Sequence, residues 1–281
     1  IALTDLFGGM GGRPGAILSG IFAGVFFGFI FPPVASYVVR VHGGYNLYNM
    51  GFAGGLLSTA FVASLHSAGI KVDVSLFWAS GHNVAFAILL YGLSAALALL
   101  GLWLGNPGRT KEDLSKMMRQ SGRLVSDFYL QYRENAYVNM GLLCAFSTTL
   151  VLALGGDLNG PTIGGILTIT GFGCFGKHLR NITPVLLGSI LSSAFNQWEF
   201  TAPSNMLAIL FSTCLAPIAG RFGVFWGLVA GFVHVRVVHH AGYLSSGFNL
   251  YNNGFAAGFV VMFLLPLIMA FRKEAKDEAN L

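Results

Sequence analysis

The feature that most constrains this chain is a series of long apolar stretches without charged side chains. Ala85–Leu104 is the clearest of them, because it contains no charged residue and does not alternate between apolar and polar positions. A helix that spans a bilayer needs about 20 consecutive, mostly apolar residues, whereas the strands of a membrane barrel alternate. The pattern therefore predicts an all-α, polytopic membrane protein rather than a barrel.

The distribution of charge supports the same class. Hydrophobic residues make up 54% of the chain and charged residues only 10%, whereas soluble domains usually carry about 25% charged residues. The net charge of +5 does not indicate a nucleic-acid partner, because most basic residues gather in residues 109–133 and in the tail after Phe271. Such clusters are typical of cytoplasmic loops. We therefore expect a multi-pass protein of a bacterial inner membrane, with the lipid bilayer as a partner and no nucleic acid.

The apolar segments differ in length. Seven approach the length of a membrane span, namely 15–39, 83–104, 140–155, 182–198, 205–220, 222–239 and 254–271. Two shorter segments, 50–65 and 161–175, are bounded by Gly, Asn or Pro. Short, interrupted segments are typical of half-helices that are buried in protein or line a cavity. The sequence predicts seven to nine membrane segments, including re-entrant half-helices.

An internal repeat indicates two related modules. Asn46–Gly55 (NLYNMGFAGG) recurs as Asn249–Gly258 (NLYNNGFAAG), and a Gly-Arg-x-Gly sequence, spaced glycines and Arg/His residues precede both copies in the same order. Transporters are often built from such repeats. We expect Gly24 and Gly231, each in a row of small residues, to lie at close helix crossings.

These patterns divide the chain into four parts. We expect a first membrane module at 1–105, a polar amphipathic cytoplasmic connector at 106–138, a second membrane module at 139–271 and a polar tail at 272–281. The chain begins with Ile rather than Met, and we expect upstream sequence to be missing. In the connector, Thr110 and Asp113 fit a capping box. The amphipathic helix that follows is expected on the membrane surface or under the bundle; a solvated connector is the alternative.

The repeated asparagines are the first candidates for a solute pathway. Asn46 and Asn49 in one module correspond to Asn249 and Asn252 in the other, just before Gly-rich apolar segments. An Asn side chain offers two donors and two acceptors without a net charge, so a neutral polar solute could exchange its water shell for such groups. Asn is also a preferred helix N-cap, and capping alone is the alternative.

The stretch Trp198–Asn205 (WEFTAPSN) is the second candidate. Pro203 removes a backbone donor and disfavours helix just before it, and Thr201 and Asn205 could satisfy the freed backbone groups or a ligand. Glu199 is an ionisable residue beside an apolar run, which makes it a candidate relay. A position at the membrane interface is the alternative for Glu199.

The region around these residues resembles the urea transporter family. Leu158-Asn-Gly-Pro-Thr-Ile-Gly-Gly, then Leu191-Ser-Ser-Ala-Phe, then Trp198-Glu-Phe-Thr-Ala-Pro-Ser-Asn-Met206 follow the order of similar motifs in that family. The resemblance implies two inverted halves, half-helices that meet at a filter, and a homo-oligomer, namely a trimer with one pore in each subunit. It also implies that a narrow pore is lined by Asn159, Gly160, Phe200, Thr201, Pro203 and Asn205. The whole chain also resembles an uncharacterised family of bacterial multi-pass membrane proteins.

No catalytic or cofactor motif is apparent. Gly171-Phe-Gly-Cys-Phe-Gly176 fits the dinucleotide pattern but lacks a preceding strand. His239 and His240 are neighbours that would point to different faces of a helix, so they do not indicate a metal site. The three cysteines show no metal or redox spacing and are expected to be small buried residues. We therefore expect no enzyme activity, no cofactor and no metal.

Together these patterns predict a channel or transporter that passes a small, neutral polar solute through a narrow pore by exchange of hydrogen bonds. One alternative is an ion- or proton-coupled secondary transporter, with Glu199 and the histidines as a relay. Another, of a different class, is an intramembrane enzyme or a non-transporting scaffold subunit. Unpaired buried polar groups facing a cavity would favour transport, and a closed, fully satisfied core would favour a scaffold.

Overall fold

The computed structural model describes residues 12–69, 78–195, 198–244 and 252–278, and within these ranges all regular structure is helical. The prediction of an all-α fold is confirmed. The elements in chain order are α2 (Gly12–His42), α3 (Asn49–Ser67), α4 (Asn83–Leu104), α5 (Pro107–Met117), α6 (Phe128–Tyr132), α7 (Asn135–Ala153), α8 (Gly160–Gly171), η1 (Phe172–Cys174), α9 (Leu179–Phe195), α10 (Pro203–Ser212), η2 (Thr213–Leu215), α11 (Ala216–Phe222), α12 (Val224–Leu244) and α13 (Asn252–Glu278).

Six helical stretches in the described ranges are long and apolar enough to cross a membrane, which indicates a multi-pass membrane protein. They are 17–42, 83–104, 135–153, 203–222, 224–241 and 252–272. The expected short segment 50–65 belongs to α3, whose 19 residues extend for about 28 Å. The other, 161–175, is mostly α8, whose 12 residues extend for about 18 Å. Since a bilayer core is about 30 Å thick, only α8 keeps the length of a half-helix.

Local signals explain where several helices begin. The side chain of Asn159 accepts a hydrogen bond from the Thr162 amide, and the Asn159 amide donates one to the hydroxyl oxygen of Thr162, so α8 begins with a capping box. In the connector the N-cap is Asn106, which accepts from Gly108. The predicted capping box of Thr110 and Asp113 is therefore wrong: both side chains bind Asn135 of α7 instead.

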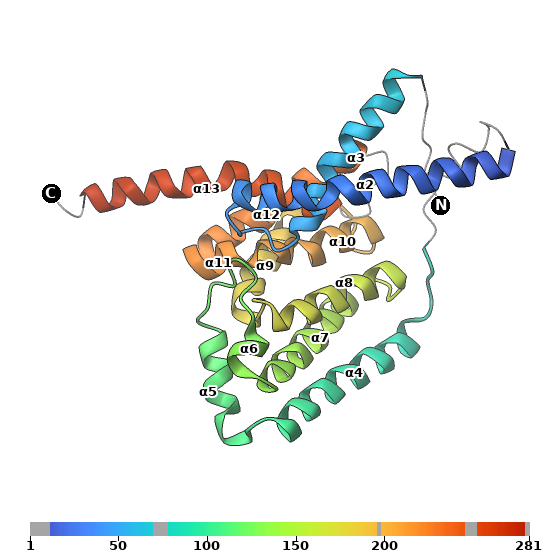
Figure 1. Cartoon of the computed structure of the whole chain (residues 1–281). Helices are drawn as coiled ribbons and strands as arrows, with labels where there is room; N and C mark the ends of the chain where they lie inside the picture. Colours follow the sequence, from blue (N-terminus) through green and yellow to red (C-terminus); the bar gives the residue numbers. More distant parts are fainter. Residues whose placement is uncertain (1–11, 70–77, 196–197, 245–251, 279–281) are drawn as a thin grey trace.

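Several close helix crossings depend on glycine. Helices α9 and α12 form the most extensive pair. A side chain at Gly231 would overlap the Val185 carbonyl, and one at Gly188 would overlap the Leu228 carbonyl. The prediction of a close crossing is confirmed for Gly231. It is wrong for Gly24, where an added Cβ would meet no atom of the described chain within 4 Å, because this part of α2 projects from the bundle (Figure 1).

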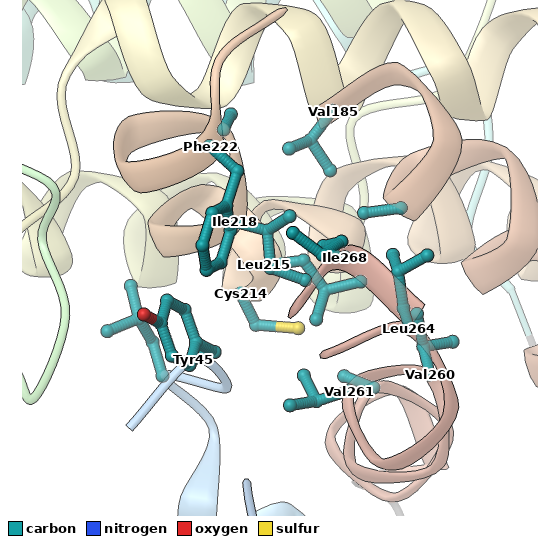
Figure 2. Packing of buried hydrophobic residues seen from close by; sticks show 14 residues of the cluster. Tyr45, Val185, Cys214, Leu215, Ile218, Phe222, Val260, Val261, Leu264 and Ile268 are labelled. Atoms are coloured by element: carbon teal, nitrogen blue, oxygen red, sulfur yellow. The ribbon is translucent and has the colours of Figure 1, made fainter. Parts of the chain in front are cut away.

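The core contains two parts that matter for the site. One lies between α11, α12 and α13, where Cys214, Leu215 and Ile218 pack against Leu264 and Ile268 (Figure 2). The other lies beneath the connector, where Met117 and Phe128 are fully buried against α7 and η1. The connector thus packs against the end of the bundle instead of being a solvated linker.

Candidate functional site

The two copies of the repeat pack against each other. Helix α3 begins at Asn49 and α13 at the equivalent Asn252. A side chain at Gly55 would overlap the ring of Phe255, and one at the equivalent Gly258 would overlap the ring of Phe52. Each copy therefore supplies a phenylalanine to the glycine of the other. The contact between the two copies is therefore reciprocal.

The asparagines of the first copy bind groups within the protein. The Asn46 side chain donates to the Gly254 carbonyl at 2.9 Å, a contact between the two copies. The Asn49 side chain donates to the Ala35 carbonyl at 3.0 Å, and its oxygen lies 2.8 Å from Nε2 of His42. Asn249 lies outside the described residues. Asn252 is the first, half-buried residue of α13.

A lysine that the sequence interpretation did not single out lies beside the first copy. Lys177, between η1 and α9, has 0% of its surface exposed. Its Nζ donates to Oη of Tyr48 at 2.6 Å and to Oγ1 of Thr213 at 2.8 Å. The same Nζ lies 4.4 Å from the centre of the Tyr48 ring and 5.0 Å from that of Phe172. This group, which we call the Lys177 cage, comprises Lys177, Tyr48, Thr213 and Phe172.

The cage joins separate parts of the chain. Tyr48 belongs to the loop before α3, and Thr213 begins η2, where the helical path from α10 to α11 tightens. The Leu47 amide donates to the Cys214 carbonyl at 3.0 Å, so the loop is bound to η2 directly here and through Lys177 at Tyr48. The ring of Tyr45 stacks on Phe222 with 5.3 Å between ring centres (Figure 2). The loop before α3 is thus docked onto the core that lies between α11, α12 and α13.

The connector closes the outer side of this loop. The Arg123 guanidinium donates to the Gly43 carbonyl at 2.6 Å and lies 4.8 Å from the centre of the Tyr45 ring. The Leu124 amide donates to the Gly44 carbonyl at 3.1 Å. Leu124 itself has φ 58° and Gly44 has φ 78°, a region that glycine adopts most readily. Residues 43–48, which we call the repeat loop, are therefore held between the connector and η2.

Charge in the cage is not balanced by a carboxylate. Within the described ranges, the one ion pair joins Lys116 to Glu112 on the exposed face of α5. The contacts of the Lys177 ammonium are two neutral hydroxyls and two aromatic rings. Burial lowers the pKa of Lys177 to about 7, because a charge in a low-dielectric interior is destabilised relative to water. Burial also lowers the pKa of the neighbouring His178 to about 4.

The second predicted group of residues forms a separate cluster at the start of α10. Asn205 Oδ1 accepts from the Ser193 hydroxyl at 3.0 Å and lies 3.2 Å from Nε2 of His239, and its Nδ2 donates to the Glu199 carbonyl at 3.2 Å. The His239 ring packs on Trp198, with 4.0 Å between ring centres. The side chains of Glu199 and Thr201 are exposed, Phe200 and Pro203 are half-buried, and Gly160 is exposed.

Helix α10 separates this cluster from the cage. Asn205 lies in its first turn, and Thr213 follows its last residue. Eight residues of helix correspond to about 12 Å. Asn159 caps α8, and its Nδ2 lies 3.4 Å from the Ala79 carbonyl. The predicted residues therefore do not meet at one point. One group lies beside the Lys177 cage and another lies around Asn205, at the two ends of α10.

One histidine is incompletely satisfied. His234 of α12 is fully buried, and its Nε2 lies 3.2 Å from Oδ1 of Asn253, next to the repeat asparagine of α13. Its Nδ1 is buried without a hydrogen-bond partner.

Lys177 and His234 carried a weak signal in the sequence: each is a polar residue beside or within an apolar run. Within the described ranges, no group of three His, Cys, Asp or Glu side chains could hold a metal ion.

Comparison with known proteins gives one match. Neither the curated proteins nor the solved structures include a match, so the resemblance to urea transporters finds no support there. A family of uncharacterised proteins, described as "Protein of unknown function (DUF1576)", matches residues 3–67 and 106–270. Because these residues are most of the chain, the protein belongs to the DUF1576 family.

Proposed function

We propose that the protein is a membrane transporter that moves a small, neutral polar solute, and that the structure is a closed state of it. The observation that carries the proposal is the reciprocal packing of the two repeat copies, with buried polar side chains of both modules beside it. Related modules whose polar residues meet at their interface are the common design of secondary transporters. Movement of one module relative to the other would expose these groups in turn.

The hydrogen bonds explain why a transporter is preferred to a permanently open channel. Asn46, Asn49 and Asn205 each use both the oxygen and the nitrogen of the amide within the protein. A solute could bind them only if these bonds were exchanged. An unsatisfied buried polar group costs about 1–3 kcal/mol, so the solute would have to offer donors and acceptors of its own. Small amides, ureas and polyols have this chemistry.

A non-transporting scaffold subunit is the second candidate. The same satisfied amides favour it, because polar networks with every partner present rigidify a core. Under this function, the Lys177 cage and the Asn205 cluster would fix the modules in one arrangement. The two candidates differ in one measurable property, which is solute flux.

The test is solute influx into proteoliposomes, followed by light scattering, with urea, acetamide and glycerol supplied separately. Transport predicts influx of at least one solute above that of protein-free liposomes, and a decrease of about tenfold or more in Asn49→Leu, which corresponds to 1.4 kcal/mol. Lys116→Met, on the exposed face of α5, is the control and should match the parent. Influx at the protein-free rate for all three solutes would reject transport of this class and leave the scaffold function.

A further inference from the structure

The Lys177 cage connects a titratable group to the contact between the modules. Its two hydroxyl acceptors come from different modules, Tyr48 from the repeat loop and Thr213 from η2. Separation of this loop from η2 must break at least one of these bonds and admit water to the Nζ atom. The hydration of Lys177 is therefore tied to the relative position of the two modules.

The cage does not stabilise a charge as well as water does. Two neutral hydroxyls and the faces of Tyr48 and Phe172 are favourable partners for an ammonium. Desolvation nevertheless dominates, so that burial lowers the pKa of Lys177 to about 7, whereas a hydrated lysine titrates near 10.4. The titratable neighbours are Tyr48 and Cys214, together with His178 and Cys174 on the same stretch of chain as Lys177, and none of them is a carboxylate.

We propose that Lys177 couples solute transport to protons: separating the repeat loop from η2 hydrates the amine, which then takes up a proton, and closing the cage releases it. The proton passes from the solution on the side from which the solute enters to the amine nitrogen, so that –NH₂ becomes –NH₃⁺, and on closure it is released to the solution on the side that the solute reaches. This inference rests on the proposed transport function and names the proton as its coupled ion. It assigns the coupling to Lys177 instead of Glu199, whose side chain is exposed.

The direction of the coupling follows from linkage. A group that holds its proton more tightly in the open state favours opening as the pH falls. At a pH between the pKa of Lys177 in the closed state and its pKa in the open state, one proton is taken up per opening event. The opening equilibrium should therefore increase about tenfold for each unit by which the pH is lowered in this window. A transporter limited by opening would show the same dependence in its flux.

The experiment uses proteoliposomes loaded with the pH indicator pyranine. Urea, acetamide and glycerol are supplied separately at pH 9 and pH 8, with light scattering to follow solute influx and pyranine fluorescence to follow protons. We expect influx of the transported solute to be about tenfold faster at pH 8 than at pH 9 and to acidify the lumen. Lys177→Met and Lys177→Arg cannot titrate in this range and should lose both effects, whereas Lys116→Met should keep them.

The outcomes separate the two proposals. Solute influx that is independent of pH and causes no acidification in the parent protein would overturn the role of Lys177 and leave transport intact. Persistence of both effects in Lys177→Arg would also overturn it. If neither Lys177 variant can be reconstituted, the measurements on the parent protein still decide. Absence of influx for all three solutes would reject the transport proposal, and the coupling with it.

Discussion

The ring of Phe52 occupies the space that a side chain at Gly258 would need. Gly258→Ala should therefore force the two repeat helices apart and lower the free energy of unfolding by about 1–3 kcal/mol, as overpacking of a close-packed core does. Gly164→Ala is the matched control, because a Cβ there would meet nothing within 4 Å. Denaturant unfolding in detergent measures both. In a Phe52→Ala background, Gly258→Ala should cost less, and equal costs in the two backgrounds would contradict the contact.

The crossing of α9 and α12 gives a second pair of glycine variants. Gly231→Ala should overlap the Val185 backbone and destabilise the protein by about 1–3 kcal/mol. Gly24→Ala should be neutral or slightly stabilising, since alanine favours helix by up to about 1 kcal/mol over glycine. Thermal unfolding of the two variants beside the parent tests the contrast. Equal losses of stability would show that α2 is packed as tightly as α12.

The role of Asn49 can be divided by two substitutions. Asn49→Leu removes the partner of His42 Nε2 and one donor to the Ala35 carbonyl, and each unsatisfied group costs about 1–3 kcal/mol. Asn49→Asp keeps the acceptor for His42 and should be the less destabilising of the two. Parallel measurements of stability and solute flux show whether the residue is structural or also lies on the pathway. Full stability and full flux in both variants would remove Asn49 from the site.

Lys177 should give the protein a distinctive pH dependence. Its pKa is about 7 in the folded protein and about 10.4 when unfolded, so the unfolded state binds more protons between these values. The free energy of unfolding should therefore rise with pH across this window, by at most about 1.4 kcal/mol per pH unit, and below the window Lys177 should add no pH dependence. The difference between the parent and Lys177→Met isolates this contribution. A pH-independent difference would show that Lys177 does not titrate there.

The orientation of the connector remains a prediction from its basic residues. Ser115, on α5, is exposed and gives an accessible position for labelling. Ser115→Cys should react with an impermeant thiol reagent only after intact cells are permeabilised. Reaction in intact cells would place the connector on the opposite side and reverse the topology of every helix.

The repeat was the most informative part of the sequence. It predicted that equivalent asparagines would stand just before a Gly-rich apolar segment in each copy, and the structure begins α3 at Asn49 and α13 at Asn252. It could not predict that Phe52 and Phe255 would each pack on the other copy, since that depends on how two helices meet in space. The same limit explains the error at Gly24: its spacing resembles that of Gly231, but only α12 has a partner helix at that position.

Lys177 shows why the rest of the site could not be predicted. A lysine that precedes an apolar helix usually extends toward water at the membrane interface. Here the connector and the repeat loop cover that end of the bundle, with Arg123 and Leu124 bound to the loop. Residues 43–48 and 121–124 are far from Lys177 in the chain, and local patterns contain no information about this cover.

Because all three cysteines are buried, the reactivity of a natural thiol can report on the opening of the protein. Cys144, Cys174 and Cys214 are buried thiols, so a single introduced cysteine can be modified without first removing them. Cys214 has a further use, because its carbonyl holds the repeat loop while its sulfur lies within the core (Figure 2). The rate at which its thiol becomes reactive would measure how often the two modules separate, in a protein with no label and no substitution.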